Sequence, residues 1–433
     1  MTEVMLREWE RVRLPRSSFG AAEYAALGDL PGHAFRLRDR GGQLELCARA
    51  LVGRVQVGSL SITVLPKLAG RSLLRLFNYA YDLDDLDFAE PITYPGGALL
   101  QDVLAELLRR HVQRIVDRGL HRSYQRTSLE LTAPRGRIDM SALARRLPLM
   151  RPVLPCVTHD RSVDHTLNQL LRAGLVVAAR LVEHEPLRAR LRDLSQRLGD
   201  EITAVPLTRT LIAAARRGMH RLVHHYRPAL QIVELLYAGA GLDLVASSAT
   251  FTAAGFLFDM NRFFQALVLR LLRDGLADCE VAHEQTLRGA YRWAHPCLPG
   301  RRRPRPRPDI TVLRRGQRFI LDAKYRDLSI GPLPREILYQ LTMYAASQGP
   351  GGAAAMIYPR HEAASLQEER LDLFDPLHTS PHASLYLRPV PLLELAVSLD
   401  AGEHGVAFRR RLARTLAFGT AGPVVAHALV TSA

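Results

Sequence analysis

Two short runs, Arg307-Pro308-Asp309-Ile310 and Leu321-Asp322-Ala323-Lys324-Tyr325, are the part of the chain around which the rest can be organised. Apolar, β-prone residues predict strands over 310–313 and 318–321, and the polar residues 314–317 between them predict a turn. One carboxylate therefore stands at the start of the first strand. A second carboxylate and an amine, two residues apart, close the second strand.

The charged side chains of these two runs are expected to form one cluster. Side chains alternate along a strand, so Asp322 and Lys324 point to the same face, and in a hairpin Asp309 comes close to both. Two carboxylates and the backbone carbonyl of Ala323 make a hard oxygen site that suits Mg²⁺, with Mn²⁺ as the alternative ion. A lysine beside the metal can orient water or stabilise charge on a phosphate. The cluster therefore predicts metal-assisted phosphodiester hydrolysis.

Lysine usage adds a second argument for this cluster. The chain has 58 Lys and Arg residues, and only Lys67 and Lys324 are lysines. Arginine is a poor replacement where a compact amine that can lose its proton is required, so a lysine kept at this position indicates function. A structural explanation stays open, because Asp-x-Lys at a strand end is common and Pro-Asp begins many turns.

A helix after the two strands extends the pattern. Residues 334–347 are predicted to be helical, with a proline near the start and apolar residues at helical spacing. Gln340 and Tyr344 are four residues apart and share one face. The order Pro-Asp, Asp-x-Lys, Gln-x-x-x-Tyr resembles the PD-(D/E)xK nuclease superfamily, in its branch with a QxxxY helix. The resemblance implies that both side chains buttress the site or touch DNA, whereas Tyr344 alone would be interpreted as a core aromatic residue.

The composition indicates a folded protein that binds polyanions. The chain has 433 residues, 47% of them hydrophobic, which is enough for two or three domains. Its net charge of +15 favours nucleic acid as a partner. No apolar run is long enough to span a bilayer, and Met1–Arg16 lacks a signal-peptide core, so we expect no membrane association. Four scattered cysteines without a CxxC pair favour a reducing, cytoplasmic location.

A run of arginines interleaved with prolines precedes Asp309. Alternating proline and arginine cannot form a helix, so the run predicts an extended basic arm. We expect this arm to hold DNA phosphates beside the metal site, and a solvated linker is the alternative. The arginines concerned are Arg301, Arg302, Arg303, Arg305 and Arg307.

The whole chain is expected to be a multidomain α+β protein. Residues 1–90 predict a β-rich N-terminal domain, residues 91–250 a mainly helical middle region, and residues 251–433 a C-terminal α/β domain in which strands and helices alternate. The expected strands are 43–48, 51–57, 60–65, 353–359 and 384–387, with a small β element over 129–132 and 135–139. The expected helices are 71–82, 98–118, 163–181, 187–198, 406–416 and helices within 207–238.

Runs spread along the chain carry a family resemblance. They are Ile62-x-Val64-Leu65-Pro66-Lys67-Leu68 followed by a Leu-Leu-Arg-Leu-Phe-Asn-Tyr-Ala helix, and the segments 117–124, 135–137 and 164–168. These runs resemble McrC, the nuclease subunit of McrBC-type modification-dependent restriction systems. The resemblance implies that residues 1–90 dock on and stimulate an AAA+ GTPase hexamer, with Lys67 as a partner contact, and that the DNA is methylated or otherwise modified. From its sequence alone, Lys67 is equally an ordinary solvated lysine.

Residues 255–268 also resemble McrC, with one departure. The run Gly-Phe-Leu-Phe-Asp-Met-Asn-Arg-Phe-Phe-Gln-Ala-Leu-Val predicts a helix capped by Asp259. The family often has a glutamate where this chain has Gln265. A glutamine keeps the oxygen and loses the charge, so metal binding is expected to weaken unless Asp259, Glu280 or Glu284 compensates.

The combined expectation is a DNA endonuclease subunit whose C-terminal domain has the PD-(D/E)xK fold. One rival is a scaffold and activator of the AAA+ partner whose own cleavage site has decayed; Gln265 favours it, and the two aspartates and the lysine oppose it. A second rival is a stand-alone repair nuclease, which the β-rich residues 1–90 oppose. The sequence leaves open the recognised modification, the cleavage pattern, the stoichiometry and the choice of GTP or ATP.

Overall fold

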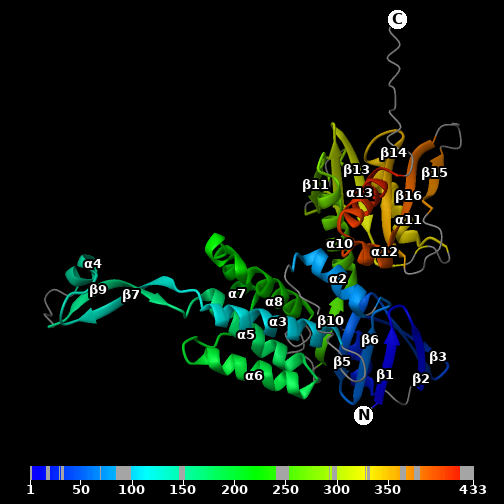
Figure 1. Ribbon diagram of the computed structural model, residues 1–433. Helices are drawn as coiled ribbons and strands as arrows, with labels where there is room; N and C mark the ends of the chain where they lie inside the picture. Colours follow the sequence, from blue (N-terminus) through cyan, green and yellow to red (C-terminus); the bar gives the residue numbers. More distant parts are fainter. Residues whose placement is uncertain are drawn as a thin grey trace, which may run out of the picture. The chain divides into compact units, whose positions relative to one another are not determined.

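The chain forms two compact units in a computed structural model (Figure 1). One unit contains Met1–Val52, Ser59–Leu86 and Asp259–Ala433, and the other contains Gly53–Gly58 and Asp87–Phe258. The mixed α+β organisation predicted from the sequence is confirmed. The structure describes residues 2–15, 20–28, 30, 34–68, 70–83, 99–145, 152–239, 253–291, 293–294, 300–326, 328, 332–360, 367–374 and 381–419.

The predicted domain boundaries, near residues 90 and 250, lie outside the described residues. The first unit nevertheless joins segments from both ends of the sequence. Phe77 of helix α2 (Gly70–Tyr81) stacks on Phe263 of helix α10 (Met260–Gly275), with ring centroids 4.3 Å apart. The N-terminal strands and the C-terminal sheet therefore share one compact body.

The N-terminal part of the first unit is built from short strands. Strand β1 pairs in parallel with β6, and β4 lies between β2 and β3 in an antiparallel sheet. The predicted strands over 43–48 and 60–65 are confirmed, and the predicted helix over 71–82 is helix α2. The strands are β1 (Thr2–Arg7), β2 (Arg11–Pro15), β3 (Phe35–Arg40), β4 (Gln43–Ala48) and β6 (Leu60–Leu65), and a short helix α1 (Ala21–Gly28) precedes β3.

A six-stranded mixed sheet forms the C-terminal part of the first unit. Its order is β11-β12-β13-β14-β16-β15, with β13, β14 and β16 parallel to one another and the other neighbours antiparallel. The strands are β11 (Glu280–His283), β12 (Ile310–Arg314), β13 (Gln317–Ala323), β14 (Gly352–Arg360), β15 (Glu369–Phe374) and β16 (Pro381–Pro391). Three helices follow strands of this sheet: α11 (Arg335–Ala346), α12 (Leu392–Ser398) and α13 (Gly402–Phe418).

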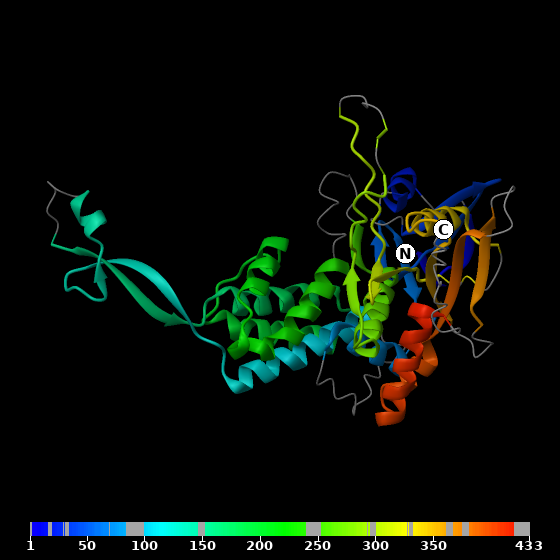
Figure 2. The same cartoon turned by 90° about the horizontal axis from the view of Figure 1, so that it is seen from above.

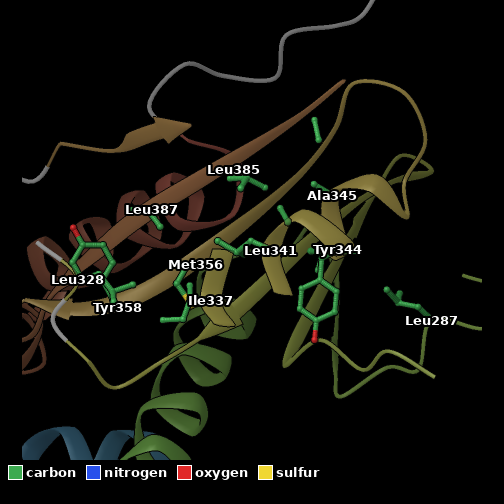
Figure 3. Close-up of a cluster of buried hydrophobic side chains, with 13 residues drawn as sticks. Leu287, Leu328, Ile337, Leu341, Tyr344, Ala345, Met356, Tyr358, Leu385 and Leu387 are labelled. Atoms are coloured by element: carbon green, nitrogen blue, oxygen red, sulfur yellow. The ribbon is translucent and has the colours of Figure 1, made fainter. Parts of the chain in front are cut away.

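Helix α11 is held on this sheet by a buried apolar cluster (Figure 3). Ile337, Leu341 and Tyr344 share the buried face of the helix, as the helical spacing predicts. They pack with Met356 of β14 and Leu385 of β16. Burial of this face fixes the side of α11 that carries Gln340 relative to the ends of the strands.

The second unit contains a helical bundle and a long β-ribbon (Figures 1 and 2). Its helices are α3 (Leu100–Arg118), α5 (Thr166–Leu181), α6 (Glu185–Gly199), α7 (Arg209–Arg217) and α8 (Arg227–Gly239). The ribbon pairs β7 (Ser123–Leu131) with β9 (Leu154–Ser162), and carries β8 (Arg137–Ile138) and α4 (Met140–Ala144) toward its far end.

Several local expectations for the second unit are corrected. The β element expected over 129–132 is one end of a nine-residue strand, and its partner β9 was not expected. The helix expected over 163–181 starts at Thr166, because the Ser162 hydroxyl accepts the Asp164 N–H and forms a turn. The segment 207–238 is interrupted after α7, where His220 caps a short 3₁₀ helix that ends at Tyr226.

Strand β10 (Ala253–Asp259) replaces the start of the helix expected from residue 255. It pairs with β5 (Leu51–Val57), whose expected bounds are confirmed. Both strands need a glycine here, because a Cβ on Gly53 would lie 2.1 Å from the Phe256 carbonyl oxygen. The helix then begins at Met260 with Asp259 as its N-cap, as predicted. Among all described helices, none is both long and apolar enough to cross a bilayer.

Candidate functional site

The predicted hairpin brings the two acidic residues to the same end of the sheet. Strand β12 pairs with β13 so that Ile310 lies opposite Leu321. The residue before β12, Asp309, accepts a hydrogen bond of 2.9 Å from the Ala323 N–H through its Oδ2. This bond fixes the Asp309 carboxylate beside the residue that follows Asp322.

Asp322 is the buried centre of the cluster. It is 1% exposed, and its Oδ2 lies 3.3 Å from Nζ of Lys324, a side chain that is 34% exposed. Burial, together with the charge of Asp309, raises the pKa of Asp322 from 3.8 to about 6, and Lys324 opposes the rise. A buried carboxylate whose ionised form is disfavoured in this way gains by binding a cation.

Helix α11 supplies a third contact to Asp322. Nε2 of Gln340 donates hydrogen bonds of 3.1 Å to Asp322 Oδ1 and 3.2 Å to the Tyr344 hydroxyl. The Tyr344 ring is 3% exposed within the apolar cluster, and burial raises the pKa of its hydroxyl to about 12. Both interpretations of Tyr344 therefore have structural support, because its ring packs in the core and its hydroxyl holds Gln340.

The donor set suits a hard cation. The oxygens of Asp309 and Asp322 and the carbonyl of Ala323 are the kind of ligands that Mg²⁺ prefers. Within the described residues there is no group of three or more His, Cys, Asp or Glu side chains that could hold a metal. A backbone carbonyl and water would therefore complete the coordination. The buried Asp322 carboxylate, whose charge burial disfavours, is the observation that favours a resident cation.

The acidic residues considered as substitutes for a glutamate at position 265 are engaged elsewhere or exposed. Asp259 accepts the Asn261 N–H at 2.9 Å and caps α10, and Glu284 pairs with Arg307. Glu280 is exposed on strand β11. Gln265 itself is half-buried on α10, and no hydrogen bond between described residues joins it to either aspartate of the cluster.

The arginine-rich run forms an extended arm that leads directly into the site (Figure 2). Its base is fixed by two backbone hydrogen bonds of 2.9 Å, from Leu287 N–H to the Pro306 carbonyl and from Glu284 N–H to the Asp309 carbonyl. Arg307 pairs with Glu284, which makes it part of the base. The other four predicted arginines are exposed: Arg301, Arg302, Arg303 and Arg305.

Some residues near the site were not predicted from the sequence. Tyr291 and Trp293 are 42% and 48% exposed, in the irregular segment that follows β11. Aromatic residues interleaved with arginines are a signal for nucleic-acid contact that could have identified them. Lys67 is exposed, as expected, and it lies beside Glu8, a buried carboxyl that no sequence pattern singled out.

Comparison with known proteins identifies the family. A family profile described as "McrBC 5-methylcytosine restriction system component" matches residues 46–359. An Escherichia coli K12 relative, "Type IV methyl-directed restriction enzyme EcoKMcrBC", is 21% identical over 327 residues, which cover 72% of this chain and 91% of the relative. The chain belongs to this family of McrBC restriction-system components, which confirms the resemblance inferred from the motifs.

A solved structure shows that the likeness in fold extends beyond the profile. The structure is a half-complex from a tetradecameric assembly of Thermococcus gammatolerans McrB AAA+ hexamers with bound McrC. The match has a TM-score of 0.58 at 20% sequence identity, and it covers 95% of this chain and 99% of the matched chain. The fold is therefore shared over nearly the full length of both chains.

Proposed function

We propose that this chain is the nuclease subunit of its restriction system and hydrolyses DNA phosphodiesters with Mg²⁺. The observation that carries the proposal is the meeting of Asp309, Asp322 and Lys324 at one end of the β12–β13 hairpin, with Gln340 bound to the buried aspartate. The mixed sheet around this hairpin and the helix α11 behind it support assignment to the PD-(D/E)xK fold.

Each residue of the cluster has a separate role in this proposal. Asp309, Asp322 and the Ala323 carbonyl hold Mg²⁺, which when bound lowers the pKa of water and neutralises phosphate charge. Lys324, partly exposed beside Asp322, orients the attacking water or stabilises the charge that develops on the phosphate. Gln340 keeps Asp322 in one orientation, and Tyr344 keeps Gln340 in place.

The arginine arm positions DNA beside this cluster. Its exposed guanidinium groups precede Asp309 by at most eight residues, so a bound phosphate backbone is guided toward the hairpin end. Such contacts carry affinity without sequence information, so they do not distinguish a modified base from an unmodified one. Recognition of the modified base is therefore assigned to a partner.

An AAA+ GTPase hexamer is the proposed partner. The half-complex of similar fold contains McrB AAA+ hexamers with bound McrC, which supports docking of this chain on an equivalent ring. We assign the contact to residues 1–90, with exposed Lys67 as one contact residue.

The test is cleavage of methylated and unmethylated plasmid by the chain with and without the AAA+ partner, in Mg²⁺ and in EDTA. Cleavage of methylated plasmid only when partner, NTP and Mg²⁺ are all present supports the proposal. Cleavage by the chain alone would support a stand-alone nuclease. Stimulation of the partner's NTP hydrolysis without any cleavage would support the alternative function, a scaffold and activator of the AAA+ partner, which Gln265 favours.

A further inference from the structure

Glu8 is a buried acidic residue outside the proposed cluster. It follows strand β1 and is 1% exposed, and its N–H donates a hydrogen bond of 3.2 Å to the Leu65 carbonyl of β6. The backbone turns directly after it, because Trp9 has a φ of 64°, a conformation that non-glycine residues rarely adopt. A buried carboxyl beside a strained residue lowers the stability of the fold, and an apolar side chain at this position would lower it less.

The groups that face Glu8 come from two distant parts of the chain. They are the Tyr325 hydroxyl, and the backbone N–H and charged amine of Lys67. Among the described residues, no hydrogen bond joins Glu8 to the Tyr325 hydroxyl, and the two groups interact electrostatically. Burial raises the pKa of Glu8 to about 7, and these neighbours only partly offset the rise. Tyr325 and Lys67 therefore share the compensation of this carboxyl.

Tyr325 is the residue after Lys324, and it is fixed on several sides. It is 1% exposed, its N–H donates to the Asn261 side chain at 3.2 Å, and its ring packs edge-on against Phe264 at 5.9 Å. The next residue, Arg326, lies over the Trp9 ring at 5.5 Å. The turn after β1 therefore contacts both residues that follow the proposed catalytic lysine.

The backbone of Lys324 is held from two directions. Its N–H donates a hydrogen bond of 3.0 Å to the Ile357 carbonyl of β14, and its own carbonyl accepts one of 2.8 Å from Arg326. The sheet fixes one side of Lys324, and the Tyr325–Arg326 turn fixes the other. Displacement of that turn would move the amine relative to Asp322, which lies 3.3 Å from it.

We propose that Glu8 and Tyr325 form a positioning pair, which holds Lys324 in its working orientation and links the N-terminal strands to the hydrolytic cluster. The inference rests on the proposed function, and it adds a route by which a partner bound near Lys67 affects cleavage. Lys67 contacts the same carboxyl, so a change at the docking surface reaches Tyr325 through one side chain. Glu8 and Tyr325 contact neither metal nor DNA in this proposal, and they act through the lysine.

Lysine NMR tests the pair without requiring activity. The chain has only two lysines, so labelling lysine with ¹³C at Cε gives two side-chain signals, and Lys67→Arg identifies which belongs to Lys324. Tyr325→Phe removes only the hydroxyl and is expected to shift the Lys324 signal. The control is Glu45→Gln, at a buried carboxyl of the same N-terminal part that pairs with Arg13, and it is expected to leave the Lys324 signal in place.

Kinetics of the full complex with its partner supply the second readout. Glu8→Leu and Tyr325→Phe are expected to lower the kcat of DNA cleavage about tenfold or more, with KM for DNA unchanged, because small displacements of a catalytic group are costly. Glu8→Gln keeps an oxygen toward the Tyr325 hydroxyl and is expected to restore most of kcat. Thermal unfolding of each variant measures any loss of fold.

The outcomes separate the two proposals. An unmoved Lys324 signal in Tyr325→Phe, or a kcat loss no larger than that of Glu45→Gln at matched stability, would overturn the positioning pair. Absence of cleavage by the wild-type complex would overturn the proposed function, and the lysine spectrum would then still decide whether Glu8 and Tyr325 control Lys324.

Discussion

The side-chain amide of Gln340 lies 3.1 Å from the carboxylate of Asp322, a residue that is 1% exposed. This hydrogen bond joins helix α11 to the end of strand β13, and it satisfies one oxygen of a carboxylate that burial disfavours. An amide donor leaves the charge of Asp322 available to a cation, which a second acid at this position would not do.

Removal of the Gln340 amide is expected to weaken the site. Gln340→Leu should lower cleavage about tenfold and raise the Mg²⁺ concentration needed for half-maximal rate, since a buried carboxylate loses its donor. Tyr344→Phe removes only the contact behind the amide and should cost less. Cleavage rates measured across a Mg²⁺ titration compare the two variants. A larger loss of rate in Tyr344→Phe than in Gln340→Leu would contradict the prediction.

The titration of Asp322 predicts how cleavage depends on pH. The pKa of this carboxyl is raised to about 6 by burial and by Asp309, and only the ionised form holds a cation well. Mg²⁺ binding and cleavage should therefore fall together as the pH drops through about 6. Calorimetric Mg²⁺ titrations at several pH values measure this, and an affinity that stays constant from pH 7 to pH 5 would exclude it.

The raised pKa of Asp322 also predicts how the free energy of unfolding depends on pH. A folded-state pKa raised from 3.8 to about 6 makes the charged carboxyl a cost that is absent at low pH and grows as pH rises through this window. Without metal, Asp322→Asn should be the more stable protein above that window, by up to about 3 kcal/mol, and should match the wild type near pH 4. Denaturant unfolding in EDTA at both pH values measures the difference.

The scarcity of lysine makes Lys324→Arg an informative substitution. The guanidinium keeps the charge, but it is larger and does not lose its proton, so cleavage should fall by about a hundredfold. Arg318→Lys, at an exposed position on the same strand, should leave cleavage unchanged and serves as the matched control. Near wild-type cleavage by Lys324→Arg would show that the residue acts only through its charge.

The arginine arm predicts the salt dependence of DNA binding. Arg302, Arg303 and Arg305 are exposed on the arm, and replacing all three with alanine should weaken binding to any sequence and lower the salt slope by about 3. The control removes the same charge from three exposed arginines of the helical unit, at positions 192, 209 and 217. Equal effects of the two sets would assign binding to net charge instead of the arm.

Strands that end at clear turn residues were predictable from the sequence. The bounds of β4, β5 and β6 agree with expectation, because each is a β-prone run ended by turn residues such as Gly58 or Pro66. The ribbon strand β9 was missed because its C-terminal half, residues 159–162, is polar, so it lacks the apolar alternation that marks a half-buried strand. The split after α7 depends on the His220 cap, which periodicity does not reveal.

The candidate site was predictable where its residues are close in sequence. Strand alternation placed Asp309, Asp322 and Lys324 together, and the resemblance to PD-(D/E)xK nucleases with a QxxxY helix added Gln340. Glu8 was not predictable, because its contact with Tyr325 joins opposite ends of the chain and depends on how the N-terminal strands pack. Long-range contacts of this kind follow from tertiary packing, and no local pattern encodes them.

The most direct test of the central claim compares the wild-type chain with Asp322→Ala in complex with the AAA+ partner, in Mg²⁺, while both DNA cleavage and NTP hydrolysis are measured. We predict that Asp322→Ala loses cleavage and still stimulates NTP hydrolysis, because we assign the buried Asp322 to the proposed metal site and partner docking to residues 1–90. Cleavage by Asp322→Ala at the wild-type rate would place the nuclease site elsewhere and contradict the account.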